Sequence, residues 1–254
     1  MATILITSVI VLKNILAYAY ETYVQNIKYI LLFSLSFVIA SIIPIFAAFP
    51  TYNDIGAIFI RTASVYSNFN LLDISVIVAS TLFSLLFLSF AVVAITTIIK
   101  HKRTSTRITA EIIKGLEKYT GRVFAIMILF TLILMAVDVL SYPTHYSGPL
   151  TAIIGLVLTP FLIYAPYSIV IDENRIGRAI GASARFFSKR FDYFLIWLLT
   201  SVILLSAVDL IFIMVGGTMA SRYLVLVVDS LFVLPFLVVL QAEMYMRRFA
   251  MLKR

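Results

Sequence analysis

The chain has 254 residues, of which 62% are hydrophobic and only 13% are charged. Soluble domains are usually ~45–50% apolar and ~25% charged, and one soluble domain of this size could not bury the excess apolar surface. The composition therefore predicts an integral membrane protein. Because there is no Cys and there are only two His, the composition excludes disulfides, thiol chemistry and a His-rich metal cluster.

The first apolar stretch, Thr3–Leu12, is too short to cross a bilayer. No basic segment precedes it and no clear cleavage motif follows it, so we expect an amphipathic surface helix to about Gln25 rather than a signal peptide. Longer unbroken apolar runs follow, and such runs predict helices rather than the alternating strands of a barrel. Six spans are predicted: Tyr29–Phe49, Ile74–Ile99, Val123–Tyr142, Leu150–Ile171, Tyr193–Gly216 and Tyr223–Met246.

Two inner segments between these spans are amphipathic. Residues 108–119 and 175–190 alternate apolar and charged side chains at helical spacing, which is typical of helices at a membrane surface. The predicted fold class is an all-α integral membrane protein. It has six transmembrane helices in three hairpins, interfacial amphipathic helices on the cytoplasmic side, and one polytopic membrane domain over residues 1–254.

The distribution of basic residues predicts the orientation. If both termini are cytoplasmic, all but two of the 20 Lys and Arg residues, Arg61 and Arg222, fall on the inner side. This asymmetry matches the positive-inside bias of membrane proteins and indicates a multi-pass protein of the cell membrane. The formal net charge of +8 reports this topology first, and a preference for anionic partners second.

Three acids lie inside predicted spans: Asp138, Asp209 and Asp229. An ionised group at the centre of a bilayer costs at least ~2.5–3.5 kcal/mol, so such residues usually face protein or water. Counting residues along each helix places all three in the outer third of the membrane, at similar depth. They form either a shared cation, proton or pore site, or hydrogen-bonded links between helices.

Prolines and inner cations give two further candidate features. Pro160 and Pro166 break span four and predict either a hinge or an ordinary kink. The four cations Lys100, Lys102, Arg103 and Arg107 lie within eight residues, and they are candidates for binding anionic lipid, nucleic-acid phosphates or an acidic partner.

Sequence patterns typical of enzymes are absent. The chain has no nucleophile elbow, Walker loop, dinucleotide fingerprint or zinc motif. The adjacent acids Asp172 and Glu173 could bind a metal, but a role at the start of the following helix fits their position better. We therefore expect a protein that is not an enzyme and has no cofactor or metal.

The residues Pro166 to Asn174, followed by Ala179 to Ser183, resemble a pattern found in several prokaryotic six-helix membrane families. One of these is the membrane domain attached to some glycerophosphodiester phosphodiesterases. The resemblance covers about 30 residues and implies a fold only, because the catalytic phosphodiesterase domain has no counterpart in this chain.

The whole chain, through its length, six spans, basic inner loops and lack of Cys, is similar to the polytopic membrane subunit of the crenarchaeal DNA-import (Ced) system. That resemblance implies an archaeal channel component in the lipid bilayer, working with other membrane subunits and a cytoplasmic ATPase, with DNA as the cargo. A homo-oligomer is a further possibility. The intramembrane acids do not suit a polyanion unless they are neutral or turned away from its path.

The main hypothesis is thus a non-enzymatic pore or scaffold subunit of a translocation apparatus, most specifically one that imports DNA. One alternative is a small-solute or ion transporter that uses the intramembrane Asp residues. Another is a lipid-binding regulatory membrane protein.

Overall fold

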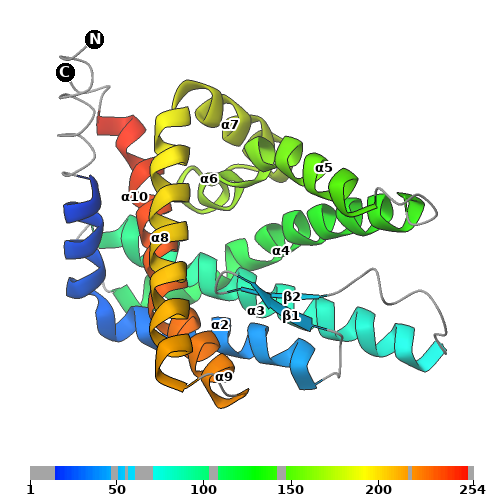
Figure 1. Cartoon of the computed structure of the whole chain (residues 1–254). Helices are drawn as coiled ribbons and strands as arrows, with labels where there is room; N and C mark the ends of the chain where they lie inside the picture. The colour runs from blue at the N-terminus through cyan, green and yellow to red at the C-terminus, as the bar shows by residue number, and fades with distance from the viewer. Residues whose placement is uncertain are drawn as a thin grey trace, which may run out of the picture.

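A computed structural model describes residues 15–46, 51–54, 57–60, 71–102, 108–141, 147–216 and 219–250. These residues are helical apart from one short hairpin and a few turn and loop residues between helices. The strands of the hairpin, β1 (Thr51–Asp54) and β2 (Ala57–Ile60), pair antiparallel with Thr51 opposite Ile60. The prediction of a helical protein is therefore confirmed for the described residues (Figure 1).

The helices follow the predicted order. An N-terminal helix, Ile15–Gln25, precedes α2 (Ile27–Phe46) and is bent away from it by 91°. The remaining elements are α3 (Leu71–Lys102), α4 (Ile108–Ser141), α5 (Ser147–Leu162), α6 (Ala165–Ile171), α7 (Ile176–Lys189), α8 (Phe191–Gly216), α9 (Met219–Val228), the π-helical turn η2 (Asp229–Val233) and α10 (Leu234–Ala250).

Five helical segments are long and apolar enough to cross a membrane: Ser75–His101, Ala110–Ser141, Gly148–Ile171, Phe191–Phe212 and Tyr223–Arg247. The number rises to six if the N-terminal helix and α2 together count as one bent span. Length and composition thus support a multi-pass membrane protein in contact with lipid. The grouping of the spans into three hairpins stays a prediction.

The amphipathic segments differ in how they join the spans. The segment 176–189 forms a separate helix, α7, as expected, and 15–25 is separate from α2. Residues 108–119 do not form a separate surface helix, because α4 continues without a break for 34 residues into the apolar span. The sequence there has no Pro, and its two glycines, Gly115 and Gly121, do not interrupt the helix.

The largest hydrophobic core lies at one end of the helices. It joins residues from the second halves of α3 and α10 with aromatic residues next to α6 and in α7 and α8; among its members are Ile98, Tyr164, Phe186, Tyr193 and Tyr245. These are the ends that the sequence places at the cytoplasmic side. From there the helices spread like a fan, with α3, α4 and α5 extending to the right of Figure 1 and α8 and α9 toward the bottom.

Candidate functional site

The intramembrane acids are placed on two separate parts of the fan. Asp229 is 1% exposed at the start of η2, and Asp209 lies half-buried on α8, which contacts η2. The two carboxyl groups are close enough to interact electrostatically. The sequence suggests that acids from different spans come together, and Asp209 and Asp229 do so.

Asp138 does not join that pair. It is 7% exposed and belongs to α4, which packs on α3, α5, α6 and α7. In Figure 1 the C-terminal end of α4, where Asp138 lies, points away from α8 and α9. Similar depth in the membrane does not fix the direction in which a helix points, and this is why counting residues could not separate Asp138 from the other two acids.

The backbone around Asp229 is unusual. The turn Asp229–Val233 is π-helical, with the amide of Leu234 donating to the carbonyl of Asp229, and Pro235 follows directly. A proline in a helix lacks a donor and crowds the carbonyl four residues earlier, and a wider turn relieves that crowding. Neither carboxylate oxygen of Asp229 has a hydrogen-bond partner. The next residue, Ser230, does have one: its hydroxyl oxygen lies 3.4 Å from the hydroxyl oxygen of Ser41.

A second cluster of polar groups lies at the opposite end of the helices, which the sequence predicts to be the cytoplasmic end. The Lys100 ammonium donates to the carbonyl of Val170 at 2.8 Å and to Glu173 Oε1 at 3.1 Å. Lys118 donates to the other carboxylate oxygen of Glu173. Hydrogen bonds from Lys118 and then Lys100 lower the pKa of Glu173 from 4.5 to about 2. This cluster ties the α6–α7 loop to α3 and α4.

The neighbouring acid, Asp172, ties the same loop to α10. Its Oδ2 accepts a hydrogen bond of 2.6 Å from the Tyr245 hydroxyl, and Ser168 lies 3.5 Å from the same oxygen. Both acids precede α7, which begins after Arg175 with no acid in its first turn, and their side chains are engaged with α10, α3 and α4. Among the described residues, no three His, Asp or Glu side chains are grouped as metal ligands.

A third acid at this end is Glu243. It is 1% exposed on α10 and accepts a hydrogen bond of 3.2 Å from the hydroxyl of Thr22. Because Thr22 belongs to the N-terminal helix, this contact fixes that helix against the core.

The two hinge candidates frame a real break in the helix. α5 ends at Leu162, and α6 begins at Ala165 with Pro166 in its first turn. The missing helical bond would join the amide of Tyr164 to the carbonyl of Pro160. The hydroxyl of Ser183 replaces it, accepting from the Tyr164 amide at 3.1 Å and donating to the Pro160 carbonyl at 2.9 Å. A side chain of α7 thus satisfies both groups that the break leaves free.

The candidate anion-binding cations are only partly described. Lys100 is engaged with Glu173 and with the backbone, so it is a structural cation in this arrangement. Lys102 closes α3, and nothing is described of its side chain. Arg103 and Arg107 lie outside the described residues. Sequence analysis missed the role of Lys100 because its partner is 73 residues away.

Comparison of the chain with protein-family models, with curated proteins and with solved structures finds no match. Function is therefore inferred from the geometry of the chain and from the chemistry of its sites.

Proposed function

We propose that this chain is a non-enzymatic pore or scaffold subunit of a membrane translocation apparatus, and that it works next to other membrane subunits. The observation that carries the proposal is the uneven packing of its helices. Of the most apolar part of α8 only 11% is buried, and of α4 only 17%, against 56% for α3. Large apolar faces on α8 and α4 are therefore free to contact lipid or the helices of a partner.

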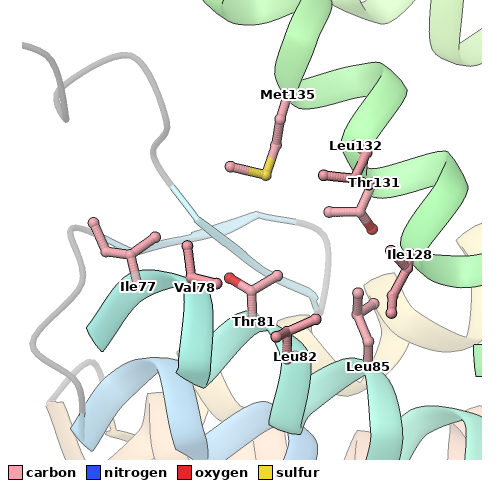
Figure 2. Close-up of a pocket in the computed structure, with 9 residues that line it drawn as sticks. All are labelled: Ile77, Val78, Thr81, Leu82, Leu85, Ile128, Thr131, Leu132 and Met135. Atoms are coloured by element: carbon pink, nitrogen blue, oxygen red, sulfur yellow. The ribbon is translucent and has the colours of Figure 1, made fainter. Parts of the chain in front are cut away.

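The space between α3 and α4 supports the same proposal. Figure 2 shows a cavity of about 90 Å³ between the first half of α3 and the second half of α4. Its lining is apolar except for two hydroxyl groups, those of Thr81 and Thr131. This cavity offers no polar path for a solute, and under the proposed function the translocation path is completed by partner subunits or by further copies.

The specific version of the proposal is import of DNA with a separate cytoplasmic ATPase. It is supported by the resemblance to the crenarchaeal DNA-import subunit and by the concentration of cations on the inner side. The intramembrane acids weigh less against it than the sequence suggested. Asp138 and Asp229 are buried among helices, where they do not face an open path for a polyanion.

Affinity purification of the full chain in mild detergent tests the proposal. We expect a membrane subunit and an ATPase to co-purify, and the double variant Leu199→Trp with Ile203→Trp to reduce their recovery. These side chains are 61% and 65% exposed on α8, so larger apolar groups are tolerated by lipid but obstruct a closely packed partner. A solitary protein, or intact DNA uptake after loss of the gene, would contradict the proposal.

A second candidate function, a cation- or proton-coupled transporter, is favoured by one observation. Asp229 is a buried acid without a hydrogen-bond partner, next to Asp209 and at a π-helical turn. Intramembrane acids and π-helical turns are both frequent at functional sites. Under this function, Asp209→Asn and Asp229→Asn abolish proton-coupled flux in liposomes while the matched control Asp138→Asn retains it. Equal flux in all three variants would exclude it.

A further inference from the structure

Helix α7 carries a line of cations on its exposed face. Arg178, Arg185 and Lys189 are exposed, and their spacing of seven and four residues places them within about 40° of one another around the helix. Arg175, the residue before the helix, is exposed as well. These four residues, here named the α7 stripe, extend over about 20 Å.

A different face of α7 is fixed to the protein. Ala179, Ser183 and Phe186 are buried, and Ser183 is bonded to the break between α5 and α6. An amphipathic helix at a membrane surface buries its apolar face in lipid, whereas α7 buries that face against its own chain. The stripe is therefore held in place on a fixed helix, and α7 lies at the upper edge of the molecule in Figure 1.

The surroundings of the stripe favour one kind of partner. The other exposed residues of α7 are Gly177 and Ser188, and a side chain added at Gly177 or Gly181 would meet open space. Protein partners bind through buried aromatic or apolar anchors, and this face offers none. Three of the four cations are Arg, whose planar guanidinium matches phosphate oxygens in a bidentate manner.

We propose that the α7 stripe binds the phosphate backbone of a nucleic acid on the cytoplasmic side. The inference deepens the DNA-import version of the proposed function and rests on it for the choice of side. The contact is independent of base sequence, because contacts to phosphates carry no direct sequence information. Each cation neutralises about one phosphate.

The test is binding of a fluorescent DNA duplex to the full chain in nanodiscs of uncharged lipid, measured by anisotropy over a range of salt concentrations. The variant Arg178→Gln with Lys189→Gln removes two stripe cations. We expect it to weaken binding and to reduce the slope of log K against log salt by about two. The matched variant Arg122→Gln with Lys28→Gln removes the same two residue types elsewhere on the inner side and is expected to leave the slope unchanged.

Two results would overturn the inference. One is an equal loss of slope in both double variants, since that indicates diffuse attraction by net charge. The other is competition by polyglutamate as effective as competition by DNA at equal charge, since that indicates an acidic protein as the partner. Neither result affects the co-purification of partner subunits, so this inference and the proposed function fail independently.

Discussion

Glu173 combines a strained backbone with two cationic partners. Its φ of 58° lies in the left-handed region, which costs a residue with a side chain about 1–2 kcal/mol. Such a conformation persists where the surroundings determine it, and here Lys100 and Lys118 hold the carboxylate from α3 and α4. The sequence singles out this loop by its adjacent acids. In the structure, Glu173 links α3 and α4 to the loop.

The lowered pKa of Glu173 predicts a pH-dependent stability. A carboxyl group whose pKa falls from 4.5 to about 2 on folding stabilises the protein above pH 4.5, and the effect disappears as the pH falls toward 2. Because the side chain is 48% exposed, solvent screening keeps the effect small. We expect Glu173→Gln to lower the melting temperature in detergent by about 1–2 °C at pH 6.

The difference between Glu173→Gln and the native chain should shrink as the pH falls below 4.5 and become small near pH 2. The control Glu117→Gln removes an exposed acid from α4 and should give a difference that does not change between these pH values. A Glu173→Gln difference that is constant with pH would show that the lysines do not hold the ionised form.

Ser183 is a small residue with a large expected effect. Ser183→Ala leaves the Tyr164 amide and the Pro160 carbonyl without a partner in a buried position. We expect the free energy of unfolding to fall by about 2–3 kcal/mol, measured by denaturation in detergent. On the same helix, Ser188→Ala removes an exposed hydroxyl and should change stability by less than about 0.5 kcal/mol. Equal effects would mean that the break does not depend on Ser183.

At the scale of the elements, α3 and α4 approach each other closely at Gly115. A Cβ added at Gly115 would lie 2.7 Å from Thr97 Oγ1 and 2.9 Å from Thr97 Cγ2. Thr97 cannot easily turn aside, because it is β-branched, is 1% exposed and bonds the Val93 carbonyl at 2.8 Å. The glycine therefore sets the distance between the two helices.

We expect Gly115→Ala to destabilise the protein by about 1–3 kcal/mol in the same denaturation assay. Adding Thr97→Ala should restore part of the loss, because it removes the two clashing atoms. The matched control is Gly121→Ala, six residues further along α4, where an added Cβ meets nothing within 4 Å. It should be neutral or stabilising, since Ala favours a helix. Loss of stability in Gly121→Ala alone would contradict this packing.

The elements that sequence could predict are those governed by local composition. Long apolar runs determine α2, α3 and α8, and the amphipathic pattern determines α7. The sequence does not reveal that α4 is continuous. Its charged first part and its apolar second part differ in composition, which suggests two elements, but one helix backbone runs through both. The Lys100–Glu173 contact and the Ser183 bridge depend on tertiary packing between segments that are distant in sequence, so no local pattern contains them.

For the whole molecule, the one-sided core has a consequence for its environment. The helix ends predicted to be cytoplasmic share an aromatic and polar core, while the parts of α4, α5 and α8 away from those ends expose side chains such as Leu140, Leu156 and Met214. In a bilayer this apolar surface faces lipid instead of water, so this arrangement of helices is compatible with contact to lipid as well as to partner helices. The orientation of the protein in the membrane decides whether the α7 stripe faces the cytosol.

The lack of cysteine makes that orientation directly measurable, since every label then reports the introduced residue. Gly148 lies exposed at the start of α5 on the predicted outer side, and Ser188 lies exposed on α7 on the predicted inner side. We expect a membrane-impermeant maleimide to label the variant Gly148→Cys in intact cells, and Ser188→Cys only after permeabilisation. The positive-inside bias is the physical reason, because moving the cations of α7 across the membrane is unfavourable. Labelling of Ser188→Cys in intact cells would place the α7 stripe outside, where it could not meet an ATPase or receive incoming nucleic acid from the membrane.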